Sequence, residues 1–241
     1  MANVQLSVGN TLSTAYDISK KHGLLLAVAL LGEVLITYLI QTAFSFGGGL
    51  SQSEIADRTQ EIGEQMGRGD TGAIVEYFKL LSQSSNPIGS ALGNIATFIL
   101  TIFIVNLTLG LVSGRYQSFT LDAFKLPFLT YVKAVVVQLL VGAICLAGLF
   151  LCIVPGIYLV CRLSYAPYAI LPEPDLDIIS AIKKSWEMTT DNVLPIFLLN
   201  LACSGIMIAG VLCCCVGYFY AGAIVYLASA VSYFVLKPNA E

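Results

Sequence analysis

Residues 23–46 read GLLLAVALLGEVLITYLIQTAFSF, an apolar run with a single ionisable residue, Glu33. A helix that crosses the hydrocarbon core of a bilayer needs about 20 such residues, at about 1.5 Å of rise each. Comparable apolar stretches follow at 88–112, 134–153, 156–171, 193–211 and 217–236. The fourth of these six stretches is the shortest. The sequence therefore predicts six membrane-spanning helices.

The composition of the 241 residues agrees with this interpretation. Hydrophobic residues make up 57% of the chain and charged residues 11%, whereas soluble domains carry about 25% charged residues. In lipid each backbone amide needs a partner within its own segment, which favours helices. We expect one all-α integral membrane domain over 1–241. The polar start of the chain lacks the features of a cleavable signal peptide, and the net charge of −3 gives no reason to expect a nucleic-acid partner.

Basic residues predict the orientation of the chain, because lysine and arginine concentrate on the cytoplasmic side of membrane proteins. One set flanks the same ends of the predicted spans: Lys20, Lys21, Arg115, Lys125, Lys133, Lys183, Lys184 and Lys237. The opposite loops carry only Arg58, Arg68 and Lys79, among six acidic residues. Both termini are therefore expected in the cytoplasm.

Three amphipathic segments, 12–22, 120–133 and 176–190, precede the odd-numbered spans. In the third, Ile178, Ile182 and Trp186 recur at helical spacing while Lys183 and Lys184 take the opposite face. Such a helix lies flat in the membrane interface with its lysines toward the headgroups. The pattern predicts three hairpin repeats, each preceded by an interfacial helix, and lipid headgroup contacts at Lys183, Lys184 and Trp186. The alternative is that these segments are merely amphipathic linkers.

Residues 47–87 form an acidic insertion in the first hairpin, expected on the extracytoplasmic side as two helices. Their predicted apolar stripes are Ile55, Ile62 and Met66 in the first helix and Ile74, Val75, Phe78 and Leu81 in the second. We expect the stripes to pack on each other or on the membrane surface. The insertion is also where a membrane or periplasmic partner protein would bind.

Two ionisable residues within the predicted spans are candidates for function, since charge inside a bilayer is costly. The first hypothesis is a buried ion pair between Glu33 and Arg162. Alternatively, Arg162 extends to the interface while Glu33 is protonated by its apolar surroundings. A proton or substrate relay is the third interpretation.

The second span carries a polar stripe at helical spacing, namely Ser90, Asn94, Thr97, Thr101 and Thr108. A stripe of hydroxyl and amide groups can line a hydrated path. More commonly it forms hydrogen bonds with neighbouring helices or with its own backbone.

The cysteine and acidic residues give little reason to expect a metal site or a catalytic site. Cys152, Cys213, Cys214 and Cys215 are assigned to the outer ends of their spans, where a disulfide can form in an oxidising compartment, although buried cysteines usually act as small hydrophobes. Glu173, Asp175 and Asp177 could bind Mg²⁺, but a solvated turn is the commoner interpretation. No catalytic motif is present. We expect no enzyme activity, no cofactor and no metal site.

Three segments resemble a known family: IVPGIYL at 153–159, RLSYAPYA at 162–169 and AIKKSWEMTT at 181–190. They are similar to a superfamily of bacterial integral membrane proteins that includes the YciC-like inner membrane proteins and the membrane domain fused to glycerophosphoryl diester phosphodiesterases. The matching positions are Pro155, Gly156, Arg162, Pro167, Ser185 and Trp186. The resemblance implies a multi-pass protein of the bacterial inner membrane. The chain has no phosphodiesterase domain, so hydrolysis does not carry over.

Three function classes follow from these observations. The first is a non-enzymatic membrane scaffold or accessory subunit that interacts with lipids, with a partner protein or with a second copy of itself. The alternative is a small transporter or channel that uses the polar stripe and Glu33. An enzyme acting on lipid headgroups would need a polar pocket around Glu173, Asp175 and Lys184.

Overall fold

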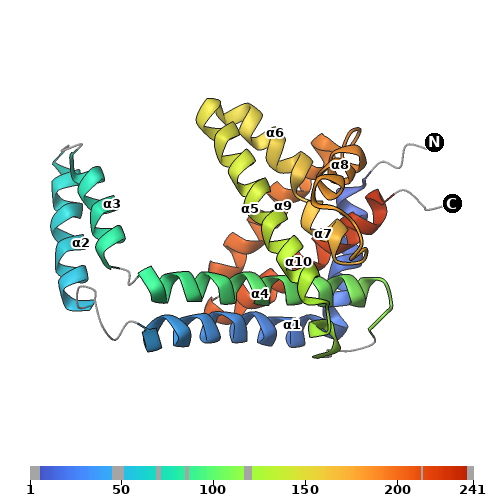
Figure 1. The fold of residues 1–241 in the computed structure, drawn as a ribbon, viewed down its shortest axis with the longest axis horizontal. Coiled ribbons are helices and arrows are strands. Elements are labelled where there is room, and N and C mark those ends of the chain that lie inside the picture. Colours follow the sequence, from blue (N-terminus) through green and yellow to red (C-terminus); the bar gives the residue numbers. More distant parts are fainter. Residues whose placement is uncertain are drawn as a thin grey trace. The chain divides into compact units, whose positions relative to one another are not determined.

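The computed structural model describes residues 6–44, 52–68, 72–84, 87–116, 121–212 and 214–237. These residues form helices and contain no strand (Figure 1). The α-helices are α1 (Val8–Phe44), α2 (Gln52–Gly67), α3 (Gly72–Ser84), α4 (Pro87–Val112), α5 (Phe128–Leu151), α6 (Ile153–Leu163), α7 (Ala166–Ile170), α8 (Ile178–Met188), α9 (Val193–Leu212) and α10 (Cys214–Leu236), and a short 3-10 helix, η1, spans Leu121–Phe124. The expected all-α fold is confirmed.

Five of the described helices contain segments long and apolar enough to cross a membrane: Val8–Ile40, Gly93–Val112, Phe128–Leu149, Val193–Leu212 and Gly217–Leu236. Large aliphatic side chains remain exposed along them, for example Leu146 at 60% and Ile208 at 63%. An exposed apolar surface of this extent is typical of contact with lipid. The helices are compatible with a multi-pass membrane protein.

The predicted fourth span, 156–171, is not one continuous helix. Helix α6 begins at Ile153 and ends at Leu163, and α7 begins only at Ala166. Pro167 lies in the first turn of α7, where its missing N–H is tolerated. In a continuous helix the proline ring would clash with the carbonyl of Leu163. The proline therefore explains why the apolar stretch divides into two helices.

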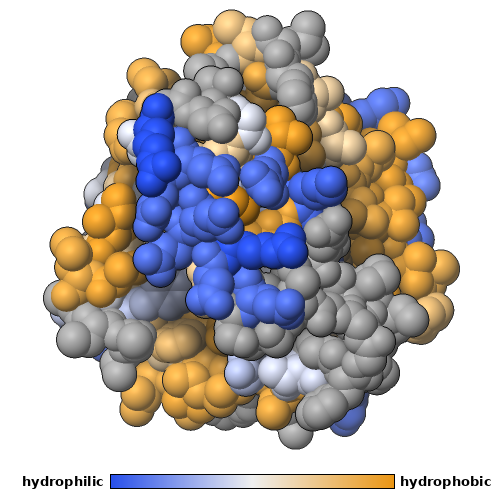
Figure 2. Space-filling model, turned by 90° about the vertical axis from the view of Figure 1, so that its left-hand side faces the viewer, coloured by the Kyte–Doolittle hydropathy of each residue, from blue (hydrophilic) through white to orange (hydrophobic). Residues whose placement is uncertain are grey.

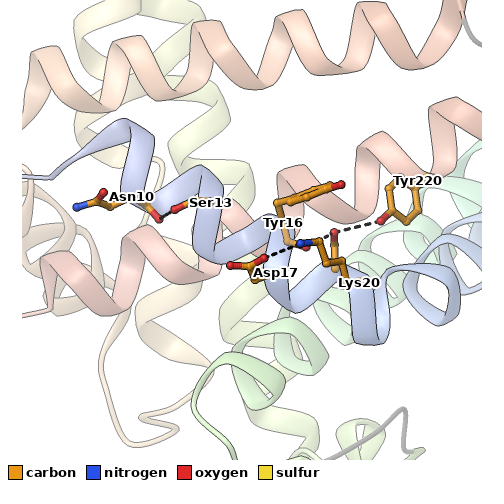
Figure 3. A network of polar contacts seen from close by, with 7 residues as sticks. Asn10, Ser13, Tyr16, Asp17, Lys20 and Tyr220 are labelled. Carbon is orange, nitrogen blue, oxygen red and sulfur yellow. Dashed lines mark hydrogen bonds and ion pairs between the residues drawn. The ribbon is translucent and has the colours of Figure 1, made fainter.

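The three amphipathic segments do not share one structure. Residues 12–22 continue without a break into the rest of α1, and 121–133 contain η1 and the first turns of α5. Only the third segment contains a separate helix, α8. The first two segments therefore contain no separate α-helix before the hairpin, and the expected three repeats with interfacial helices stay a prediction. Figure 3 shows the first segment beside α10, where Ser19 Oγ lies 3.2 Å from the Tyr220 hydroxyl.

Residues 1–32 together with 99–241 make up one compact unit, and residues 33–98 make up a second. In the first unit, α5 packs on α6 and α9 packs on α10. A Cβ atom at Gly156 would lie 2.8 Å from the Cα of Leu149, and one at Gly210 would lie 2.8 Å from the carbonyl oxygen of Gly217. Backbones this close are typical of membrane helices that meet at small residues.

The second unit contains the α2–α3 hairpin, which has its own small core of Ile62, Ala73 and Leu80, with Tyr77 packed beside them. The two helices of the insertion therefore do pack on each other. Ile74 and Val75 of the predicted α3 stripe take no part in this contact, because Ile74 is exposed and Val75 is 70% exposed; the packing of this stripe on the membrane surface stays a prediction. The contact follows Ala73 and Leu80, one position earlier, since the small alanine lets the helices approach. The side chains of Ile55, Phe78 and Leu81 lie outside the described part of the chain.

Candidate functional site

A polar buried junction of the first unit lies where the last turn of α6 meets α8, and we call it the α6–α8 corner. Arg162 of α6 is only 4% exposed. Its Nη1 donates to the carbonyl oxygen of Trp186 at 2.9 Å and to Thr189 Oγ1 at 3.4 Å. In return, Ser185 Oγ donates to the carbonyl oxygen of Arg162 at 2.8 Å. Thr189 Oγ1 donates to the same carbonyl oxygen at 3.3 Å, so α8 and its C-terminal end satisfy a carbonyl in the last turn of α6.

Two aromatic rings enclose the guanidinium group. Its central carbon lies 4.2 Å from the ring centroid of Trp186 and 5.6 Å from that of Tyr158. The two rings are nearly perpendicular, at 82°, with centroids 6.1 Å apart. Cation–π contacts of this kind are worth about 0.5–2 kcal/mol, depending on desolvation. The charge of Arg162 is thus stabilised by ring faces and a carbonyl oxygen.

One edge of the guanidinium group is unused. Among the described residues, Nε has no hydrogen-bond partner, and Nη2 forms no hydrogen bond there either. Nε itself is buried, whereas the two residues whose rings contact the guanidinium group are partly open, with Trp186 38% and Tyr158 42% exposed. Nε and Nη2 together form the planar fork with which arginine binds phosphate or carboxylate oxygens in pairs.

Two lysines in helices, Lys133 and Lys184, and one just after α10, Lys237, hold the segment between α7 and α8. Lys184 Nζ of α8 lies 2.6 and 2.7 Å from the two carboxylate oxygens of Glu173, and Lys237 Nζ, just after α10, lies 3.0 Å from one of them. Lys133 Nζ of α5 donates to the carbonyl oxygens of Pro174 and Leu176. The hydrogen bond from Lys184, and secondarily that from Lys237, hold the pKa of Glu173 below its ordinary value. We call this group the lysine clamp.

Two residues of the acidic cluster, Glu173 and Asp177, have separate structural roles. Glu173 belongs to the lysine clamp, and Asp177 caps α8 by accepting a hydrogen bond from the backbone N–H of Ile179. Within the described ranges, no group of three or more His, Cys, Asp or Glu side chains is arranged to hold a metal ion.

The described ends of the chain reach the same region of the first unit. The backbone N–H of Leu6, just before α1, donates to Asn192 Oδ1 at the start of α9. Lys237, just after α10, reaches Glu173 in the lysine clamp. Both ends therefore lie beside the segments that flank α8.

The predicted intramembrane pair is divided between the two units. Glu33 is half-buried in the second unit, whereas Arg162 lies in the first and bonds to α8. The Glu33–Arg162 pair stays a prediction. Of the predicted headgroup residues, Lys183 is exposed, Lys184 bonds to Glu173 and Trp186 stacks on Arg162.

The described residues of the polar stripe in α4 form hydrogen bonds with a neighbouring helix and with the backbone of α4. Thr97 Oγ1 lies 3.2 Å from Thr37 Oγ1 of α1 and 3.0 Å from the carbonyl oxygen of Gly93. Thr108 is buried and bonds to carbonyl oxygens of its own helix. Asn94 is exposed, Thr101 is half-buried, and the side chain of Ser90 lies outside the described part.

The outer thiols are only partly described. Cys152 carries an exposed free thiol at the turn between α5 and α6. Residue 213 and the side chains of Cys214 and Cys215 lie outside the described part. A disulfide between these positions stays a prediction.

Sequence reasoning missed the lysine clamp and the role of α8 as the partner of Arg162. The signal for the clamp was a single acidic residue, Glu173, near the end of a span that basic residues flank.

Comparisons of the chain with protein-family models, with curated proteins and with solved structures found no match.

Proposed function

We propose that the protein is a non-enzymatic, multi-pass membrane scaffold that binds the phosphate groups of anionic lipids at the α6–α8 corner. The observation that carries this proposal is the unused fork of Arg162 beside two partly exposed aromatic rings. Tryptophan and tyrosine favour the headgroup level of a bilayer. A lipid phosphate reaches the fork when the side chains of Trp186 and Tyr158 move apart, and it then accepts two hydrogen bonds.

In the proposed topology the chain crosses the membrane six times, with α6 and α7 forming the fourth crossing as a broken helix. Both termini and α8 face the cytoplasm of a bacterium, in keeping with the basic residues at this end and with the family resemblance. The hydrogen bond of Leu6 to Asn192 and the ion pair of Lys237 with Glu173 support this arrangement, because they bring both described ends to α8. An even number of crossings returns the chain to its starting side.

Within this proposal the two adjacent lysines of α8 have different roles. Lys184 is largely neutralised by Glu173, whereas Lys183 is exposed and lies three residues before Trp186, on a neighbouring part of the helix surface. A basic residue near an anionic membrane surface contributes about 1 kcal/mol of binding. Lys183 therefore adds to headgroup binding, and Lys184 chiefly supports the fold.

The test is lipid binding by the full-length protein, measured by native mass spectrometry in detergent with added phosphatidylglycerol. Arg162→Met and Lys183→Gln should each weaken binding by about fivefold or more, as expected for the loss of about 1 kcal/mol or more. Lys125→Gln is the matched control, because Lys125 is equally basic but pairs with Asp122 at an exposed site. Unchanged binding by Arg162→Met would reject the proposed lipid site.

A small transporter is the second candidate, favoured by one feature of the second unit. Glu33 is a half-buried acid within an apolar helix, one turn before the Thr37 hydroxyl that contacts Thr97. An ionisable group at such a position is a functional candidate by default. Glu33→Gln should change proton-coupled solute flux in proteoliposomes if this candidate is correct, and equal flux would argue against it.

A further inference from the structure

The α2–α3 hairpin separates its charged residues from its uncharged ones. An α-helix turns by about 100° per residue, so each position of α2 has an angle relative to Ile62, which is buried in the core shared with α3. Counted in this way, the charged residues of α2 all lie between about 40° and 160° in one direction: Glu54, Asp57, Arg58, Glu61 and Glu64. Figure 2, which looks at the molecule from the side of α2 and α3, shows hydrophilic residues gathered there.

The opposite direction around α2 holds uncharged residues. Between about 40° and 120° from Ile62 in this direction lie Ala56, Thr59, Gly63 and Met66. All four are exposed. A Cβ atom at Gly63 would meet nothing within 4 Å, and Met66 is 39% exposed. This side of α2 is therefore both open and free of charge.

Helix α3 continues the same division. Glu76 and Lys79 line one cavity together with Arg58 and Glu61 of α2, so the charges of both helices share one side of the hairpin. Ile74 lies about 160° around the helix from Glu76 and about 140° from Lys79, and it is 49% exposed. Ile74 therefore belongs to the side of the hairpin opposite to the charges.

The uncharged face of the hairpin consists of Ala56, Thr59, Gly63, Met66 and Ile74. An element that is charged on one side and uncharged on the other lies flat at a bilayer surface with its charges toward water, because charged groups lose hydration when they leave water. The charged side carries five carboxylates and only two cations. It is thus negative, and anionic headgroups would repel it.

The chain itself holds the hairpin close to a membrane surface. Helix α3 ends at Ser84, and α4, which contains a segment long enough to cross a membrane, begins at Pro87. Three Cα–Cα steps of about 3.8 Å cover at most about 11 Å. The end of α3 therefore lies within about 11 Å of the first residue of α4.

From the division of charge and this short connection, we infer that the uncharged face of the hairpin lies on the lipid surface of the bilayer that α4 crosses. The charged side then faces the aqueous phase. This inference rests on the proposed residence of the chain in a membrane, but it does not depend on phosphate binding at the α6–α8 corner.

The experiment measures tryptophan fluorescence of the full-length protein in liposomes. Trp186→Phe removes the single native tryptophan, and one new tryptophan is then placed by Ile74→Trp or Met66→Trp on the uncharged face, or by Glu76→Trp on the charged side as the matched control. Lipids brominated along their acyl chains should quench the first two about twofold or more strongly than the control. Acrylamide in the aqueous phase should show the reverse order.

A fourth variant, Leu146→Trp, reports membrane residence separately, since Leu146 is 60% exposed on an apolar segment of α5. Quenching by brominated lipid at position 146 but at neither position 74 nor position 66 would overturn this inference alone. The absence of quenching at all four positions would overturn membrane residence as well. Equal quenching at positions 74, 66 and 76 would also overturn the inference. Blue-shifted emission at position 74 without lipid quenching would show that another protein chain covers the face, with the same consequence.

Discussion

Arg162→Met tests the structural part of the α6–α8 corner. The substitution removes the guanidinium group but keeps a long, flexible, apolar side chain that can fill the same space. It removes the hydrogen bond from Nη1 to the carbonyl oxygen of Trp186 at 2.9 Å and the cation–π contacts with Trp186 and Tyr158.

The expected loss follows from these contacts. A hydrogen bond to a charged group contributes about 1.5–3 kcal/mol, and a cation–π contact at a partly exposed site about 0.5–1 kcal/mol. Part of this loss is offset, because Nε is buried without a partner among the described residues and methionine removes that cost of about 1–3 kcal/mol. The net destabilisation should be about 2 kcal/mol.

The assay is reversible unfolding in mixed micelles, with helicity followed by circular dichroism and no added lipid. Excluding lipid separates the internal contacts of Arg162 from phosphate binding. Lys183→Gln, which alters an exposed residue of the same corner, should change the unfolding free energy by less than about 0.5 kcal/mol. A loss smaller than about 0.5 kcal/mol for Arg162→Met would refute the contacts described between α6 and α8.

Three further predictions concern the lysine clamp and the helix contacts. Because Lys184 and Lys237 hold the pKa of Glu173 below its ordinary value of 4.5, the clamp stabilises the fold above that pH and loses this effect as the pH falls through the lowered pKa. The stability difference between wild type and Glu173→Gln should therefore narrow as the pH falls below 4.5 and through the lowered pKa, and a pH-independent difference would contradict the clamp. Gly156→Ala should destabilise the protein by about 1–3 kcal/mol in the same assay, since its Cβ would meet Leu149, whereas Gly205→Ala, with open space around it, should not. Ile62→Ala should raise amide hydrogen exchange in the α2–α3 hairpin by removing core contacts, and equal exchange in Ile62→Ala and in the exposed-site control Val75→Ala would count against the described core.

Several elements of the fold could be predicted from the sequence because hydropathy and helical spacing report them directly. Apolar length predicted five of the six expected spans as long helices. The periodicity of Ile178, Ile182 and Trp186 predicted α8, and the two helices of the insertion were expected at 47–87. In each case the pattern lies within one segment of the sequence, so it can be recognised without knowing which other segments pack against it.

The remaining features depend on contacts between distant segments. The mean hydropathy of 156–171 indicates only that the stretch is apolar. It does not show that Pro167 ends the helical run and divides the stretch into α6 and α7. The position of Arg162 beside Trp186 depends on how α8 packs against α6, and the spacing of 24 residues between them does not reveal it. In the lysine clamp, Lys184 of α8 and Lys237, just after α10, both pair with Glu173, and sequence spacing does not reveal this.

The central claim is that the chain is a multi-pass membrane protein whose two ends lie on the same side of the bilayer. The most direct test attaches a reporter that is active only in the cytoplasm to each end of the full-length protein, and extracts the membranes with alkaline carbonate. We predict that the protein stays in the membrane pellet and that both reporters are active. Release into the soluble fraction, or activity at one end only, would contradict the claim.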